Sequence, residues 1–146
     1  MSFNRSLFSS ASGEWETPSE LFNALDAEFH FTLDACASPD KAKCTRYYSE
    51  RALEETWAGI VWVNPPYGRL IGQWTRKGRQ SAEAGATVVM LLPSRTDTKW
   101  WHEDVMRSSE IRFIRGRLKF GGAMTGAPFP SAVVIFRSKE EARDVA

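Results

Sequence analysis

Two continuous apolar runs mark the centre of the fold that this sequence predicts. Residues 59–64 (GIVWVN) and 86–93 (ATVVMLLP) contain almost no polar side chains, which is typical of strands buried on both faces of a sheet. Residues 31–34 alternate apolar and polar positions and end at Asp34, as expected of a short strand. Residues 131–138 (SAVVIFRS) predict a late strand.

Helical periodicity separates these strands. Residues 17–29 carry apolar side chains three or four positions apart, with Thr17 as the expected N-cap, Pro18 at the first helical position and Glu20 completing a capping box. Residues 68–85 predict a second helix with an exposed basic face. The other expected elements are a short edge strand around Tyr47–Tyr48, a short helix at 97–107 capped by Asp97 or Thr98, one or two strands at 110–120, and a small terminal helix at 139–145.

The alternation of strands and helices indicates an α/β fold with three layers and a mostly parallel sheet. Ligands of such sheets bind beyond the carboxyl ends of the strands. Asp34, Asn64 and Pro93 each end an apolar strand, so we expect them at one edge of the sheet. The 146 residues suit one domain, assigned to residues 15–146 after a flexible Ser-, Asn- and Gly-rich arm at 1–14.

The net charge of +1 means that any surface for nucleic acid has to be a local basic patch. Cys36 and Cys44 lack the spacing of a zinc site, and only His30 and His102 are available to complete one, so we expect no metal. No apolar run is long enough to span a membrane, and no apolar leader opens the chain. We therefore expect a cytoplasmic protein with reduced thiols.

The first apolar run stops abruptly at Asn64-Pro65-Pro66-Tyr67, because proline cannot continue a central strand. An asparagine oxygen and the carbonyl of Pro65 are hydrogen-bond acceptors, and a tyrosine ring can stack on a flat group. This combination suits a planar amine, and it would stabilise the positive charge that develops when the amine nitrogen attacks an electrophile. The alternative is a Pro-Pro turn that closes a strand, with Tyr67 packed on the surface.

This motif and the segments around it resemble the small phage-type DNA N6-adenine methyltransferases, from about residue 15 to residue 137. The segments that carry the resemblance are WETPSELFNALDAEF, FTLDACA, NPPYG, LLPSRTDTKWWH, GRLKF and APFPSAVVIF. The resemblance implies a shortened Rossmann-like class I methyltransferase fold, S-adenosylmethionine as donor and adenine in DNA as acceptor. It also implies a bacteriophage or prophage protein that works in a bacterial host cell.

The resemblance implies roles for particular residues. It makes Asn64, Pro65, Pro66 and Tyr67 the catalytic loop. Thr17 and Pro18, in ETP, are similar to the segment that meets the methionine end of the cofactor, although a helix cap explains Thr17 equally well. The remaining cofactor residues, from LDACA, are Asp34, Ala35, Cys36 and Ala37.

The sequence also departs from the general pattern of such enzymes. It has no glycine-rich loop after the first strand and no obvious second strand that ends in an acidic residue to hold the ribose hydroxyls. Only 29 residues separate Asp34 from Asn64. The adenosine half of the pocket is therefore reduced, open, or completed by Tyr47, Tyr48 or a second protomer, and both a monomer and a homodimer remain open.

Several residues are candidates for contact with DNA. Each has a plain structural alternative: a capped helix start, a solvated strand face, or packing in a stiff loop. Arg115, Arg117 and Lys119 share a face if their segment is extended, and such a face would bind phosphates. The other candidates are Arg95 and Asp97 after Pro93, and Phe129, placed to stack on an extruded base opposite Tyr67.

We therefore expect a site-specific or loosely specific DNA methyltransferase that modifies adenine N6 after the base has left the duplex. An RNA adenine or protein glutamine N-methyltransferase would use the same motif, since a glutamine amide is also planar. A nucleic-acid-binding protein that has lost methyl transfer is a third reading, kept open by the missing glycine loop. Binding of S-adenosylmethionine separates this last reading from the others.

Overall fold

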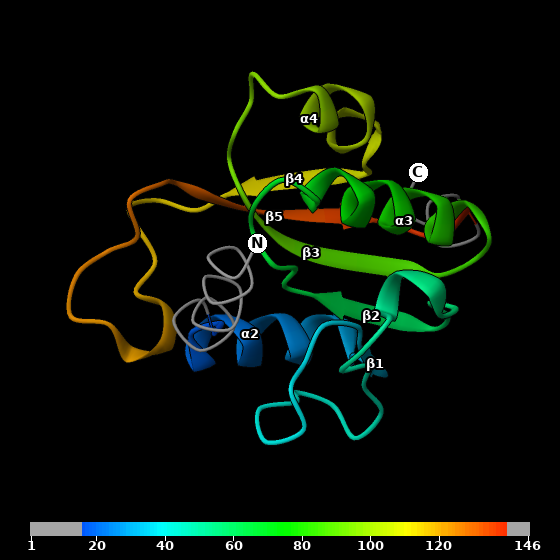
Figure 1. Cartoon of the computed structure of the whole chain (residues 1–146), viewed down its shortest axis with the longest axis horizontal. Coiled ribbons are helices and arrows are strands. Elements are labelled where there is room, and N and C mark those ends of the chain that lie inside the picture. Colours follow the sequence, from blue (N-terminus) through cyan, green and yellow to red (C-terminus); the bar gives the residue numbers. More distant parts are fainter. Residues whose placement is uncertain (1–15, 140–146) are drawn as a thin grey trace.

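A five-stranded sheet in the order β1-β2-β3-β5-β4 forms the middle of the molecule (Figure 1). The computed structural model describes residues 16–139. The strands are β1 Leu33–Asp34, β2 Ile60–Val63, β3 Thr87–Pro93, β4 Glu110–Phe113 and β5 Ser131–Phe136. The helices are α2 Ser19–Phe29, α3 Ile71–Glu83 and α4 Lys99–Glu103, with 3-10 turns at Ala52–Glu54, Val105–Arg107 and Phe120–Gly122.

The α/β class is confirmed, but the sheet is mixed rather than mostly parallel. β1–β2 and β2–β3 pair in parallel, whereas β3–β5 and β4–β5 pair antiparallel. The segment between β4 and β5 contains no α-helix that would cross the sheet, so β5 returns antiparallel beside β4. Strand β5 therefore lies between β3 and β4 in the sheet. The parallel half of the sheet carries the expected site.

Helices cover both faces of the sheet, which confirms the three layers. On one face, Phe22, Leu25 and Phe29 of α2 pack with Trp62 of β2. On the other face, α3 and α4 pack through a second cluster that includes Trp74 and Trp101. All seven residues of β3 are buried, and this explains why its sequence is a continuous apolar run.

The start of α2 differs from the prediction. The helix begins at Ser19 with Pro18 in the N-cap position, and no side chain caps it. Thr17 is therefore not the N-cap, and the predicted capping box with Glu20 is wrong. The Thr17 hydroxyl instead accepts a hydrogen bond from Asn64. At α4 the cap is Thr98, whose hydroxyl accepts from the backbone N–H of Trp101 at 3.3 Å.

The strand predicted within residues 110–120 covers only its first four residues, as β4. Gly116 then has a φ of +76°, a conformation that glycine adopts without strain and that turns the chain. Arg115, Arg117 and Lys119 consequently follow one another along a loop, and strand alternation does not align them. The expected arm at 1–14 and nearly all of the expected helix at 139–145 lie outside the described residues.

Candidate functional site

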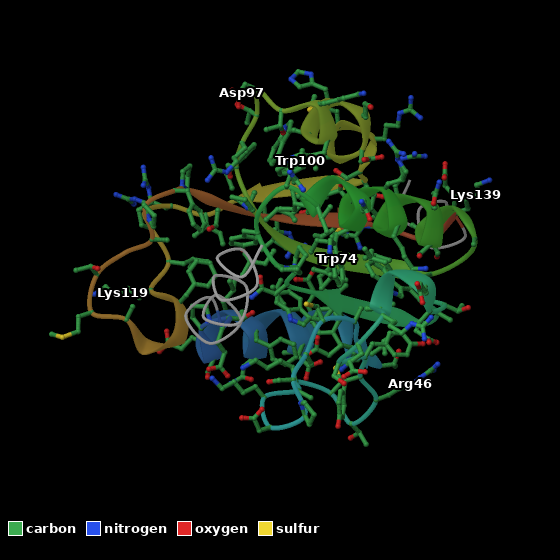
Figure 2. All side chains as sticks on the ribbon, in the orientation of Figure 1. Arg46, Trp74, Asp97, Trp100, Lys119 and Lys139 are labelled. Carbon is green, nitrogen blue, oxygen red and sulfur yellow. The ribbon has the colours of Figure 1, made fainter. Side chains whose placement is uncertain are left out.

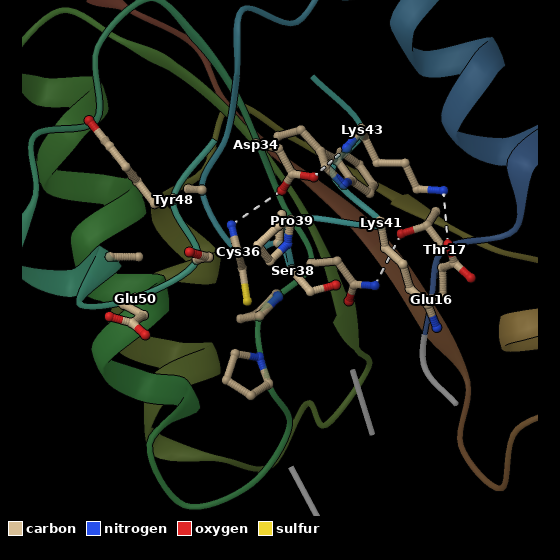
Figure 3. Close-up of a pocket in the computed structure, with 18 of the residues that line it drawn as sticks. Glu16, Thr17, Asp34, Cys36, Ser38, Pro39, Lys41, Lys43, Tyr48 and Glu50 are labelled. Carbon is tan, nitrogen blue, oxygen red and sulfur yellow. Dashed lines mark hydrogen bonds and ion pairs between the residues drawn. The ribbon is translucent and has the colours of Figure 1, made fainter. Parts of the chain in front are cut away.

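A pocket of about 470 Å³ lies at the carboxyl ends of β1 and β2 (Figure 3). Its volume is in the range of sites that hold a cofactor or another small molecule. Of the expected catalytic and cofactor residues, Pro18 and Tyr67 do not line it. Those that do are Thr17, Asp34, Ala35, Cys36, Ala37, Asn64, Pro65 and Pro66.

Asp34 fixes the loop that forms one wall of this pocket. One carboxylate oxygen accepts from the backbone N–H of Cys36 at 3.2 Å, and the other accepts from that of Lys43 at 2.9 Å. The residue is 2% exposed, and this burial raises the pKa of its carboxyl to about 6, although the Lys43 and Cys36 N–H groups act in the opposite direction. The chain from Cys36 to Lys43 is thus tied to the end of β1.

A rudimentary further strand lies outside β1. Tyr47 forms a parallel bridge with Asp34, Tyr48 N–H donates to the Asp34 carbonyl at 2.9 Å, and Ala37 N–H donates to the Tyr48 carbonyl at 3.0 Å. The predicted edge strand at Tyr47–Tyr48 is therefore present as one bridge. Two residues further on, Glu50 lines the pocket.

Glu50 is a site residue that the sequence analysis does not identify. Its signal is an acidic residue two positions after the edge strand and sixteen positions beyond Asp34. Dinucleotide-binding folds place the carboxylate that holds a ribose in a similar position. In Figure 3, Tyr48 and Glu50 lie on one side of the pocket, Glu16 and Thr17 on the other. The pocket therefore has a carboxylate at each end and Asp34 in its wall.

Asn64 stands at the end of β2, and its side-chain amide is oriented by Thr17. The amide nitrogen donates to the Thr17 hydroxyl at 3.0 Å, and Thr17 is 4% exposed. Because Thr17 accepts from the nitrogen, the amide oxygen is held on the other side of the group. The two residues are 47 positions apart, so this contact ties the start of α2 to the loop after β2.

Tyr67 is held in an aromatic cluster beside the pocket. Its hydroxyl donates to the Leu91 carbonyl at 3.3 Å, and burial raises the pKa of that hydroxyl, so the ring stays neutral. The ring meets Phe129 edge-on at 5.4 Å and Phe120 edge-on at 6.3 Å. Phe129, 8% exposed, thus packs directly against Tyr67, and the Arg95 guanidinium lies 6.0 Å from the Phe129 ring.

The remaining candidates for contact with DNA are farther from this cluster. Asp97 is exposed at the start of the α4 region, and Lys119 is exposed on the long segment between β4 and β5; Figure 2 shows the two well apart. Arg115 is exposed on the same segment. Arg117 donates to the Ala127 carbonyl at 3.4 Å. The structure therefore brings Phe129 to Tyr67 and Arg95 to Phe129, but it brings none of the other four candidates to this cluster.

The thiols have no features of nucleophiles. Burial, together with the charge of Asp34, raises the pKa of Cys36 to about 12 and that of Cys44 to about 11. Within residues 16–139, no group of three or more His, Cys, Asp or Glu side chains is arranged to hold a metal ion. In the same part of the chain, no helix combines the length and apolarity that crossing a membrane requires.

A pocket at the carboxyl ends of parallel strands is that of an α/β protein that binds a small ligand. Residues 6–145 match the family model described as DNA N-6-adenine-methyltransferase (Dam). The chain therefore belongs to the DNA N-6-adenine-methyltransferase (Dam) family, as its motifs predict.

Two phage proteins are among its relatives. The chain is 32% identical over 152 residues to the DNA N-6-adenine-methyltransferase of Escherichia phage T1, with 87% of this chain and 63% of that protein covered. It is 32% identical over 136 residues to the DNA N-6-adenine-methyltransferase of Haemophilus phage HP1, with 86% and 79% covered. The chain thus spans a little under two thirds of the phage T1 protein.

Proposed function

We propose that this chain transfers a methyl group from S-adenosylmethionine to the N6 amino group of adenine in DNA, in the cytoplasm of a bacterial host. The observation that carries the proposal is the Asn64 amide, which lines the pocket and is oriented by Thr17. Membership of the family and the phage origin of the relatives support it. The proposal is tested by measuring the transfer of a labelled methyl group from S-adenosylmethionine to duplex DNA. A protein that binds DNA but transfers no label to the DNA would contradict the proposal.

We place the cofactor in the pocket of a shortened class I fold within a single catalytic domain, residues 15–146. When bound, S-adenosylmethionine supplies an electrophilic methyl group. The residues that line the pocket fit it: Glu50 would accept from the ribose hydroxyls, and Thr17, which precedes Pro18, would lie at the methionine end, where Asp34 would accept from the ammonium. Ala35 and Ala37 let the backbone approach the ligand, and Cys36 lines the wall between the two ends.

The catalytic loop acts on a base that has left the duplex. The adenine amino group donates to the Asn64 oxygen and to the Pro65 carbonyl, and the base stacks on Tyr67, whose ring Phe129 supports from the edge. Asn64 and Pro65 would stabilise the positive charge that develops on N6 as it receives the methyl group from the sulfonium of the donor. The proton then leaves N6 for solvent. The stiffness of Pro65-Pro66 holds these acceptors in place.

We place the DNA across the carboxyl edge of the sheet. Arg95, beside Phe129, is close enough to the catalytic cluster to contact the target nucleotide. The exposed side chains of Asp97, Arg115 and Lys119, together with Arg117, are proposed contacts to flanking DNA. Glutamine in a protein and adenine in RNA are the competing acceptors, and either would use Asn64 in the same way.

The ammonium role of Asp34 predicts a pH dependence. Because the pKa of Asp34 is raised to about 6, its charge is present at pH 7 and largely absent at pH 5. S-Adenosylmethionine should therefore bind about tenfold more tightly at pH 7 than at pH 5. The raised pKa has the opposite effect on the stability of the free protein. As the pH rises from 3.8 to about 6, the buried carboxyl becomes charged, and the free energy of unfolding falls.

Calorimetric titrations of the wild type and Asp34→Asn at both pH values test this prediction. In Asp34→Asn the affinity for S-adenosylmethionine should be the same at both pH values and close to the weaker affinity that the wild type shows at pH 5. Asp40→Asn is the matched control, since Asp40 is exposed on the same loop and does not line the pocket. Equal pH dependence in Asp34→Asn and wild type would place the ammonium elsewhere.

The orientation of Asn64 by Thr17 predicts a graded effect on turnover. Thr17→Val keeps the shape but removes the acceptor, and it should slow methyl transfer roughly two- to tenfold, the usual value of one net hydrogen bond. Thr17→Ser keeps the hydroxyl and should stay near the wild-type rate. Single-turnover rates with saturating cofactor and DNA measure both.

A double-mutant cycle shows whether Thr17 acts through Asn64. If it does, Thr17→Val adds little to Asn64→Ala, because the group that it positions is gone. Additive losses in the double variant would mean that Thr17 acts independently, through the cofactor or through stability.

A further inference from the structure

A second cavity, of about 510 Å³, lies between α3 and α4. Hydrogen-bond donors line it, and we call it the α3–α4 groove. Its exposed or half-buried donor side chains are Arg69, Gln73, Arg76, Lys77 and Gln80 from the α3 segment and Lys99 from α4. None of the roles described above uses this groove.

The groove carries excess positive charge. Its acidic residues are compensated: Asp104 is 1% exposed and accepts from Arg79 Nε at 2.8 Å, and Glu103 lies 4.0 Å from Lys99. Arg69 and Arg76, by contrast, form no ion pair within residues 16–139, and both are exposed. A chain with a net charge of +1 thus concentrates unpaired cations here.

The donors are regularly spaced. Within α3, Gln73, Arg76 and Gln80 follow at intervals of three and four residues, which places them in one row along the helix. Arg69 lies two residues before the first residue of α3. From Gln73 to Gln80 the row is about 10 Å long at about 1.5 Å per residue. Guanidinium groups and side-chain amides are groups that contact phosphates and the edges of bases.

An aromatic side chain closes one end of the row. A Cβ atom at Gly72 would lie 3.3 Å from Trp100 Cβ, so α4 approaches α3 closely at this point. Trp100 is half-buried and lines the groove, and Figure 2 shows it between the two helices. Lys77 also lines the groove, and its ammonium lies 5.6 Å from the centre of the Trp57 ring.

One residue of the groove lies close to the catalytic loop along the chain. Arg69 follows Tyr67 by two residues. Trp74 lines the cofactor pocket, whereas Gln73 and Arg76 of the same helix line the groove. A duplex whose adenine enters the catalytic loop therefore has its neighbouring backbone within reach of α3.

We propose that the α3–α4 groove binds the phosphate backbone of the duplex DNA that flanks the target adenine. The inference rests on the proposed function, in which DNA is the substrate. It adds a binding surface to the residues on the carboxyl edge, so the DNA contacts the protein on both sides of the catalytic loop. Phosphate contacts of this kind set the position of the duplex and are independent of its sequence.

The test is the salt dependence of binding to a fluorescein-labelled 30-bp duplex of mixed sequence, followed by fluorescence anisotropy. Arg69→Gln/Arg76→Gln should lower the slope of log K against log salt by about 2 and weaken binding on the order of tenfold at low salt. Its affinity for S-adenosylmethionine and its methylation rate at saturating DNA should equal those of the wild type. Arg107→Gln/Lys139→Gln is the control, with two exposed charges removed outside the groove.

The outcomes separate this inference from the proposed function. A wild type that methylates DNA, together with a groove variant whose slope and affinity are unchanged, would overturn the groove alone. An equal loss of slope in the control variant would also overturn it, because binding would then follow total charge rather than the groove. A wild type that neither binds nor methylates duplex DNA would overturn both.

Discussion

Asn64→Ala should reduce the rate of methyl transfer by on the order of 10²–10³-fold, the usual effect of removing one charge-stabilising group from a closed site. The amide oxygen is the group that matters, because Thr17 already accepts from the nitrogen at 3.0 Å. Asn64→Asp keeps an oxygen acceptor in nearly the same position, and it should retain more activity than the alanine variant. Both rates are measured in single turnovers, as N6-methyladenine formed per enzyme.

Two controls keep this result interpretable. Asn64 lies at the end of a strand and is half-buried, so the melting temperature should move little in either variant. Affinity for S-adenosylmethionine should stay close to that of the wild type, because the lost hydrogen bond is the one that Asn64 accepts from the adenine amino group. An Asn64→Ala protein that folds, binds the cofactor and methylates DNA at the wild-type rate would contradict the catalytic role of Asn64. Pro65-Pro66 would then only end the strand.

Glu50→Ala should raise the dissociation constant of S-adenosylmethionine by roughly ten- to a hundredfold, because hydrogen bonds to a charged group are worth about 1.5–3 kcal/mol. The carboxylate lines the pocket opposite Glu16 and Thr17 (Figure 3), where the ribose of the bound cofactor would lie. Calorimetry gives the affinity, and the methylation rate at saturating cofactor should change far less than the affinity.

Glu55 provides the matched control for Glu50. It is an exposed acidic residue five positions further on, and it does not line the pocket. Glu55→Ala removes the same charge and should leave the affinity unchanged. Equal affinities for the wild type and Glu50→Ala would mean that other residues hold the adenosine half, for example those of a second protomer.

Asp34 and Asn64 of the pocket are predictable from the sequence because local signals place them. An apolar run that stops at a polar side chain puts Asp34 and Asn64 at strand ends, and parallel pairing of β1 and β2 brings those ends together. Both line one pocket, as expected. The two prolines after Asn64 likewise need no tertiary information, since proline itself ends the strand.

Features that depend on distant contacts are not predictable in this way. Thr17 fits an N-cap by every local rule, and only its contact with Asn64, 47 positions away, gives its hydroxyl another partner. Local patterns also predict the strand 131–138 without its direction or its place between β3 and β4. The edge strand at Tyr47–Tyr48 is predicted and is present as a single bridge, but so short a strand gives no periodic signal that identifies Glu50 as a site residue.

The central claim is tested most directly by finding which atom receives the methyl group. The wild-type protein is incubated with S-adenosylmethionine that carries a labelled methyl group and, in separate reactions, with duplex DNA, RNA or a mixture of proteins. Each product is then digested and analysed by mass spectrometry. The account predicts labelled N6-methyladenine from the DNA reaction, at a rate that Asn64→Ala strongly reduces. Label on RNA adenine or on glutamine in place of DNA, or no label in any reaction, would contradict it.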